Sequence, residues 1–188
     1  MGQACSLTCR CGEMQWHIDE GAEGRHMMCY CADCQTAARH LGQADAYLTN
    51  GGTQLFQTVP GNIHFDKGRA HLRMFRLSPN GIFRWYAKCC NTPIANTLPK
   101  SGFPFVGAVL PAGHTGFGRI SARVRTKDAS ARIRESGMIA TVYGIFFRAA
   151  KAAITKTGTA TPFFNDTGGP VAEAEILTLE KRNKARPS

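Results

Sequence analysis

Residues 29–34 read Cys29-Tyr30-Cys31-Ala32-Asp33-Cys34, so half of the side chains in this short run are thiols. Two further groups flank it along the chain, Cys9-Arg10-Cys11-Gly12 before it and Cys89-Cys90 after it. Of the eight cysteines, only Cys5 lies outside these three groups. The N-terminus lacks the basic start and apolar run of a secretory signal, so we expect a reducing compartment. Clustered thiols in such a compartment favour metal ligation over disulfides.

The spacing within each group predicts how the sulfurs could meet. In a β-strand, residues i and i+2 face the same side, so Cys9 and Cys11 would present two sulfurs together, as would Cys29 and Cys31. Cys34 is expected to fold back from the turn that follows. Zinc binds thiolates in a tetrahedron, and short C-x-C pairs suit one small ion better than an iron–sulfur cluster.

Counting sulfurs then predicts two zinc sites of different kinds. One is a closed, structural site with four thiolates, from Cys9, Cys11, Cys89 and Cys90. The other has three thiolates and an open fourth position, from Cys29, Cys31 and Cys34. Open zinc sites are typical of catalysis. His40 is an alternative fourth ligand there, and Asp33 is a candidate general base.

Composition predicts a single, mainly β domain with a C-terminal helical segment. The 188 residues are 43% hydrophobic, enough for a core, and the 20 glycines and 9 prolines predict many turns and short strands. We expect strands in residues 7–18, 25–31 and 105–110, and hairpins over 54–66 and 71–86. Helices are expected over 34–41, 137–154 and 172–181, the second with Arg148 and Lys151 on its outer side. The sequence has no nucleophile elbow, P-loop or dinucleotide fingerprint, which excludes the enzyme classes built on them.

The charge is concentrated in the C-terminal part of the chain. The formal net charge is +10, and residues 119–188 alone carry 13 basic and six acidic side chains. Between Arg119 and Arg134, six basic residues are offset only by Asp128, and no aromatic residue interleaves them. This pattern predicts a solvated basic face, weak and nonspecific nucleic-acid binding, or a site for a small anionic ligand. The apolar run Met138–Phe147 stops at Arg148 and looks too short to span a bilayer, so we expect a cytoplasmic protein without a membrane partner. The sequence leaves the oligomeric state open.

The three cysteine groups together resemble the glutathione-dependent formaldehyde-activating enzyme family, which includes centromere protein V relatives. The resemblance rests on C-x-C-G at Cys9–Gly12, C-x-C-x-x-C at Cys29–Cys34, and Cys90-Asn91-Thr92-Pro93 after the aromatic pair Trp85-Tyr86. It covers roughly residues 5–115 and leaves a helical, basic extension over about 119–188.

The resemblance implies a zinc-stapled, β-tent-like fold and carbon–sulfur lyase-like chemistry, as in S-(hydroxymethyl)glutathione synthesis. Under it, the catalytic residues are Cys29, Cys31 and Cys34, which would hold a zinc-bound adduct of a small thiol such as glutathione. The alternative function is a noncatalytic, zinc-stabilised binding module whose basic surface contacts nucleic acid or protein.

The late cysteine pair departs from the family pattern. Ala87 stands where the first cysteine of that pair belongs, and Cys89 is the obvious substitute. Adjacent residues in a strand point in opposite directions, so Cys89 and Cys90 can reach one ion only if the chain turns there. Asn91 is compatible with the left-handed conformation of such a turn. Alternatively, one of this pair donates its sulfur to the site of Cys29, Cys31 and Cys34.

Overall fold

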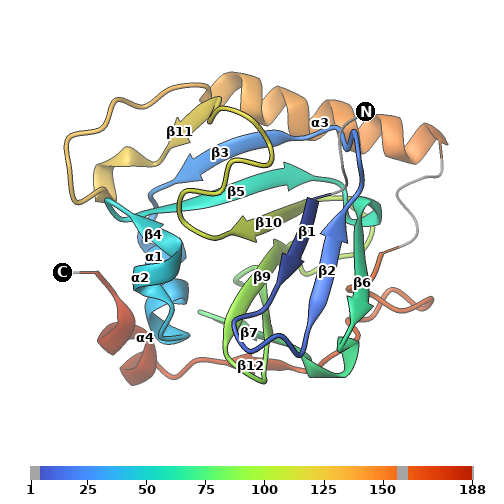
Figure 1. The fold of residues 1–188 in the computed structure, drawn as a ribbon, viewed down its shortest axis with the longest axis horizontal. Coiled ribbons are helices and arrows are strands. Elements are labelled where there is room, and N and C mark those ends of the chain that lie inside the picture. Colours follow the sequence, from blue (N-terminus) through green and yellow to red (C-terminus); the bar gives the residue numbers. More distant parts are fainter. Residues whose placement is uncertain (1–4, 156–160, 188) are drawn as a thin grey trace.

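A computed structural model describes residues 5–155 and 161–187 of the chain, and it consists of two β-sheets with helices at their margins (Figure 1). The small sheet is antiparallel and has the spatial order β1-β2-β6. Its strands are β1 (Cys5–Thr8), β2 (Gln15–Ile18) and β6 (Ile63–Lys67).

The large sheet contains the remaining strands and extends from β11 at one edge to β12 at the other. In spatial order they are β11 (Ala122–Val124), β3 (Arg25–Cys29), β5 (Gly52–Thr58), β10 (Val106–Leu110), β9 (Thr92–Thr97), β8 (Phe83–Ala87), β7 (Leu72–Arg76) and β12 (Ala174–Ile176), with β4 (Leu48–Thr49) also paired to β5. The edge strands β11 and β12 run parallel to their neighbours, whereas the inner pairs are antiparallel.

The main core joins the two sheets. In β2, exposed Gln15 and half-buried His17 alternate with the buried Trp16 and Ile18, which is the pattern of a strand with one face on the core. All residues of β9 and β10 are buried. The fully buried side chains are contributed by both sheets and include Trp16, Ile63, Trp85, Ile94 and Val106. The apolar faces of the two sheets therefore stabilise each other.

The C-terminal part of the chain contributes to the same core. Phe163 is fully buried, and its ring centroid lies 5.1 Å from that of Trp85. Because β11 and β12 also complete the two edges of the large sheet, these described segments after residue 119 are an integral part of the fold.

Three helices gather at one end of the molecule, with α4 beside α1 (Figure 1). They are α1 (Ala32–His40), α2 (Ala44–Tyr47) and α4 (Leu179–Ala185). Short 3-10 turns occupy Pro60–Asn62, Arg69–His71 and Thr126–Asp128.

The helix α3 (Met138–Thr155) packs against β5 and β11. Its orientation is unexpected, because its large apolar side chains face away from the core. Its buried residues are small, and include Ala149 and Ala152, whereas Tyr143 and Phe146 are 72% and 62% exposed. The prediction that Arg148 faces outward is wrong, because its guanidinium donates a hydrogen bond to Gln57 of β5.

By length and composition, α3 is apolar enough to cross a membrane, since its 18 residues have a mean hydropathy of 1.3. The apolar stretch is therefore longer than the run Met138–Phe147 indicated, because the helix continues past Arg148 with mostly apolar residues.

The predicted mainly β fold with a C-terminal helical segment is confirmed, as are the strand at 105–110, the hairpin of β7 and β8, and the helices near 34–41 and 137–154. The hairpin over 54–66 is wrong, because Pro60–Asn62 carries the chain from β5 in the large sheet to β6 in the small one. The strand over 7–18 is interrupted by a turn, so it forms the β1–β2 hairpin instead. The helix over 172–181 is replaced by β12 and then α4, which begins at Leu179.

Candidate metal centres

The first candidate centre joins the two sheets at their turns. Cys9 and Cys11 lie in the turn between β1 and β2, and Cys89 and Cys90 lie in the turn between β8 and β9. Their four Sγ atoms lie within 4.8 Å of one another. The centre therefore links the hairpin of the small sheet to a hairpin of the large one, and we call it the four-cysteine cluster.

Both turns depend on left-handed backbone conformations. Gly12 has φ 81° and Asn91 has φ 57°, the conformation expected for Asn91 from the sequence. Because the chain turns at Asn91, both Cys89 and Cys90 can face the same point. The geometric reason given for Cys9 and Cys11 was wrong, since they meet through a turn and not on one face of a strand.

Backbone and hydroxyl groups surround these sulfurs with hydrogen-bond donors. The amide of Met14 donates to Cys9 Sγ at 3.2 Å, and the Thr92 hydroxyl lies 3.1 Å from Cys90 Sγ. Burial acts to raise the pKa of Cys90, but hydrogen bonds from Thr92 and the Cys11 backbone outweigh it and lower that pKa to about 6. Such bonds favour thiolates, the form in which cysteine binds metal.

The second candidate centre lies where β3 ends and α1 begins, and we call it the three-cysteine cluster. Cys29 is the last residue of β3, Cys31 is the N-cap of α1, and Cys34 lies in the first turn of that helix. The amide of Cys34 donates to Cys31 Sγ at 3.4 Å. The positive end of the helix dipole favours negative charge at these sulfurs, because they lie at the N-terminus of α1.

The distances between sulfurs fit a zinc ion in both clusters. Four sulfurs at about 2.3 Å from a tetrahedral zinc lie about 3.8 Å from one another. In the three-cysteine cluster, Cys29 Sγ lies 3.5 Å from Cys31 Sγ and 3.7 Å from Cys34 Sγ. In the four-cysteine cluster, Cys9 Sγ lies 3.5 Å from Cys11 Sγ and 3.7 Å from Cys89 Sγ. All eight cysteines are free thiols, so both clusters could hold a metal ion.

A buried arginine supports the three-cysteine cluster, and no local sequence pattern indicates it. Arg84 of β8 is 5% exposed and forms no ion pair with a carboxylate among the described residues. It lines a small cavity under α1 together with Cys34 and Asn96, whose Oδ1 accepts a hydrogen bond from Arg84 Nη1 at 3.3 Å. A buried guanidinium is costly unless a negative charge lies nearby.

The thiols supply that negative charge. Hydrogen bonds from Cys29 and Cys31, together with the charge of Arg84, lower the pKa of Cys34 despite its complete burial. Hydrogen bonding with Cys31 and Cys34, together with burial, raises the pKa of Cys29, so Cys34 loses its proton before Cys29 does. Three thiolates that held a divalent ion would carry one net negative charge, which the guanidinium would balance.

The described residues supply no fourth histidine, cysteine or carboxylate ligand atom to the three-cysteine cluster. His40 lies at the far end of α1 with its ring 4.9 Å from that of Phe75, so it is not the fourth ligand. Cys89 and Cys90 both belong to the four-cysteine cluster, which excludes the sharing of one sulfur. Asp33 is exposed and lies 3.7 Å from Arg182 of α4.

A family model with the description "Family of unknown function (DUF6151)" matches residues 1–175, a range that includes both cysteine clusters. The chain belongs to this family. No curated protein matches the chain. Among solved structures, it is similar to a crystal structure of a Rhodobacter sphaeroides protein, at 17% identity and a TM-score of 0.38, over 58% of this chain and 90% of that one. The resemblance to formaldehyde-activating enzymes stays a prediction.

The basic run between Arg119 and Arg134, which we call the basic segment, borders the three-cysteine cluster. β11 pairs with β3, where Val124 is the partner of Cys29, and the Asp128 carboxylate accepts a hydrogen bond from the Ala32 amide at 3.0 Å. Asp128 thus caps the N-terminus of α1, a contact without a local sequence signal because 96 residues separate the partners.

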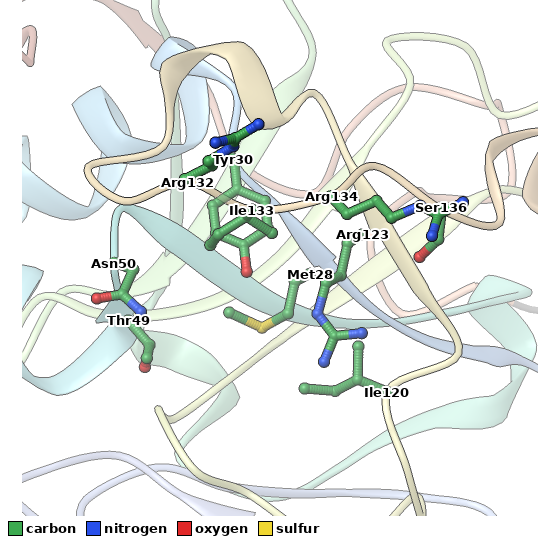
Figure 2. Close-up of a pocket in the computed structure, with 10 residues that line it drawn as sticks. All are labelled: Met28, Tyr30, Thr49, Asn50, Ile120, Arg123, Arg132, Ile133, Arg134 and Ser136. Carbon is green, nitrogen blue, oxygen red and sulfur yellow. The ribbon is translucent and has the colours of Figure 1, made fainter.

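A pocket in this segment has an arginine-rich lining (Figure 2). Arg123, Arg132 and Arg134 surround apolar side chains such as Met28 and Ile133. Figure 2 shows the three guanidinium groups pointing in different directions and not toward one point. The arrangement suits a dispersed basic surface better than a site for one small anion.

Proposed function

We propose that the protein binds zinc at both cysteine clusters and uses the three-cysteine cluster to bind an external thiol. The observation that carries the proposal is the difference in ligand count. The four-cysteine cluster has a complete tetrahedral set, whereas the described residues give the other cluster three sulfurs and no fourth ligand. A closed set suits a structural ion, and an incomplete one suits an exchangeable ligand.

The surroundings of the three-cysteine cluster also favour a thiolate ligand. Zinc bound there would lower the pKa of a coordinated thiol and hold it as a thiolate. A fourth thiolate would leave the centre one negative charge beyond what Arg84 balances, and the N-terminus of α1 partly offsets that charge. The net charge of +10 favours the approach of an anionic thiol such as glutathione, which carries two carboxylates.

The chemistry that fits is the reversible addition of this thiol to formaldehyde or another small aldehyde, a carbon–sulfur lyase-like reaction. In the addition, the sulfur forms a bond to the carbonyl carbon, and the carbonyl π electrons move to the oxygen. That oxygen takes up a proton equivalent to the one that the thiol released. The reverse reaction breaks the carbon–sulfur bond and releases the aldehyde. A cytoplasmic location would keep all the thiols reduced.

Calorimetric titration of reduced glutathione into the zinc-loaded protein tests the thiol site. We expect one equivalent to bind and Cys31→Ala to abolish binding, while the matched control Cys5→Ala, outside both clusters, keeps it. No heat at millimolar glutathione in the unmutated protein would contradict the proposal. Binding that survives Cys31→Ala would move the thiol site elsewhere.

The arginine-rich surface favours a second candidate function, a noncatalytic zinc-stabilised module that binds nucleic acid weakly. Its dispersed guanidinium groups resemble a surface that contacts phosphates without reading bases. The affinity should fall as salt rises, and a triple change of Arg123, Arg132 and Arg134 to Ser should reduce the salt dependence. Binding that singles out one sequence, or that is independent of salt, would contradict this function.

A further inference from the structure

Two histidines and an aspartate form a third group of possible metal ligands, on the small sheet and outside both cysteine clusters. His17 of β2 and His64 of β6 are partners in the strand register, so their side chains leave the same face of the sheet. Their rings are nearly parallel, with centroids 5.0 Å apart. Asp19 follows β2 directly and places its carboxylate next to both rings.

The possible donor atoms of this group converge. Asp19 Oδ1 lies 3.1 Å from His64 Nε2 and 3.9 Å from His17 Nε2, and one ligand atom from each residue lies within 4.8 Å of the other two. Two imidazole nitrogens and one carboxylate oxygen suit zinc and other divalent first-row transition metals. All three side chains are partly exposed, so water can complete the coordination.

A fourth residue holds one ring in the orientation that such a site needs. Asp66 accepts a hydrogen bond from His17 Nδ1, at 2.8 Å to Oδ1 and 3.0 Å to Oδ2. A neutral imidazole that donates from Nδ1 presents an unprotonated Nε2, and His17 Nε2 lies 3.9 Å from Asp19 Oδ1. A carboxylate behind a metal-binding histidine is a recurrent feature of metal sites, where it fixes the ring and raises its basicity.

We propose that His17 Nε2, His64 Nε2 and the Asp19 carboxylate bind a divalent transition-metal ion, with Asp66 as a positioning residue. The proposal is independent of the thiol chemistry proposed above, because the two sites share no residue. In the absence of metal, the proton of His64 Nε2 occupies the short contact to Asp19. A bound ion would replace that proton and bridge β2 to β6.

The test uses protein whose cysteine clusters are already loaded with zinc, and the probe is Zn²⁺ alone. We expect calorimetry to show one further equivalent of zinc, and ring proton signals of His17 and His64 to shift together in NMR spectra. Both His64→Ala and Asp19→Asn should abolish this equivalent. Asp66→Asn should weaken it about 10- to 100-fold, the usual effect of losing a supporting carboxylate.

His71→Ala serves as the matched control, since His71 lies outside the group and its variant should bind zinc as the unmutated protein does. Metal analysis before the titration establishes that the cysteine clusters are full, and circular dichroism establishes that each variant is folded. A titration without a further equivalent at millimolar zinc would overturn the proposal. Unchanged binding in both folded variants, His64→Ala and Asp19→Asn, would also overturn it.

Discussion

The guanidinium of Arg84 and the thiol of Cys34 line one small cavity, although Arg84 lies on strand β8 and Cys34 lies on helix α1. Both side chains are buried, and the positive charge of Arg84 helps to lower the pKa of Cys34. This relationship joins the three-cysteine cluster to the centre of the large sheet. It also explains how a buried arginine that has no carboxylate partner among the described residues is tolerated in the core.

Arg84→Met should therefore weaken metal binding at the three-cysteine cluster, by about 10- to 100-fold. The cause is the loss of the charge that balances three thiolates. Arg84→Lys should keep a larger part of the affinity, and Arg73→Met, on the exposed side of the neighbouring strand β7, should keep all of it. Competition with a zinc chelator measures the zinc affinities of the three variants. Equal zinc retention by all the variants would show that Arg84 has no such role.

Cys11→Ala should unfold the protein or lower its melting temperature by about 10 °C or more, because the energy of a structural zinc is folding energy. The expectation holds even though Cys11 is exposed, since its loss opens the four-cysteine cluster that joins the two sheets. Thermal unfolding followed by circular dichroism, with Cys5→Ala as the control, measures the effect. Metal-free protein with the melting temperature of the zinc-loaded form would contradict it.

In metal-free protein, Cys90 should be the first cysteine of its cluster to react with iodoacetamide. Its pKa is lowered to about 6, so it is mostly thiolate at pH 7, whereas burial and the adjacent thiols raise the pKa of Cys89. The alkylation rate should rise through pH 6 and then level off. Thr92→Val should move this rise to higher pH, because the hydroxyl no longer stabilises the thiolate.

The lowered pKa of Cys90 also determines how its ionisation changes the stability of the fold with pH. The pKa of Cys90 is lower in the folded protein than its ordinary value of 9.0, so its ionisation stabilises the fold fully above pH 9. This contribution declines as the pH falls toward 6.

Peptide mapping after alkylation, with and without zinc, identifies the reactive residue. Preferential labelling of Cys89 at pH 7 would contradict the assignment.

The unusual orientation of α3 predicts an asymmetry between its two faces. Phe146→Ser should change the free energy of unfolding by only about 0.5 kcal/mol, because the ring is 62% exposed. Ala149→Leu should destabilise the fold by about 1–3 kcal/mol, because Ala149 is buried and a larger side chain there would overpack its surroundings. Urea unfolding of both variants checks this. The opposite ranking would mean that the aromatic face is covered in solution.

The division of the cysteines into groups of four and three could be predicted by counting, because clustered thiols leave few ways to complete a tetrahedron. The strand geometry used to support it failed at Cys9 and Cys11, where Gly12 allows a tight turn. The prediction of a hairpin over 54–66 was wrong because Pro60-Gly61-Asn62 indicates only a turn. It does not show whether the chain returns beside β5 or crosses to the other sheet.

Other features depend on distant partners and had no local signal. The role of Arg84 depends on the position of β8 beneath α1, which nothing near Arg84 in the sequence indicates. The role of Asp128 depends on its contact with the N-terminus of α1, which the basic residues around it do not indicate. The periodicity of α3 indicates a helix but does not show which face meets the sheet. The small residues Ala149 and Ala152 allow α3 to approach the sheet closely. At the margins of this contact, Arg148 pairs with Gln57 and Lys151 pairs with Glu23.

Zinc-edge X-ray absorption of the protein with both cysteine clusters loaded, before and after addition of glutathione, tests the central claim most directly. Four sulfurs on one ion and three on the other give an average of about 3.5 sulfur ligands per zinc. Asp19→Asn protein is used, so that no zinc occupies the histidine group. We expect the average to rise to about four when glutathione binds. An average of four before glutathione is added, or one that glutathione does not change, would contradict an open three-cysteine site.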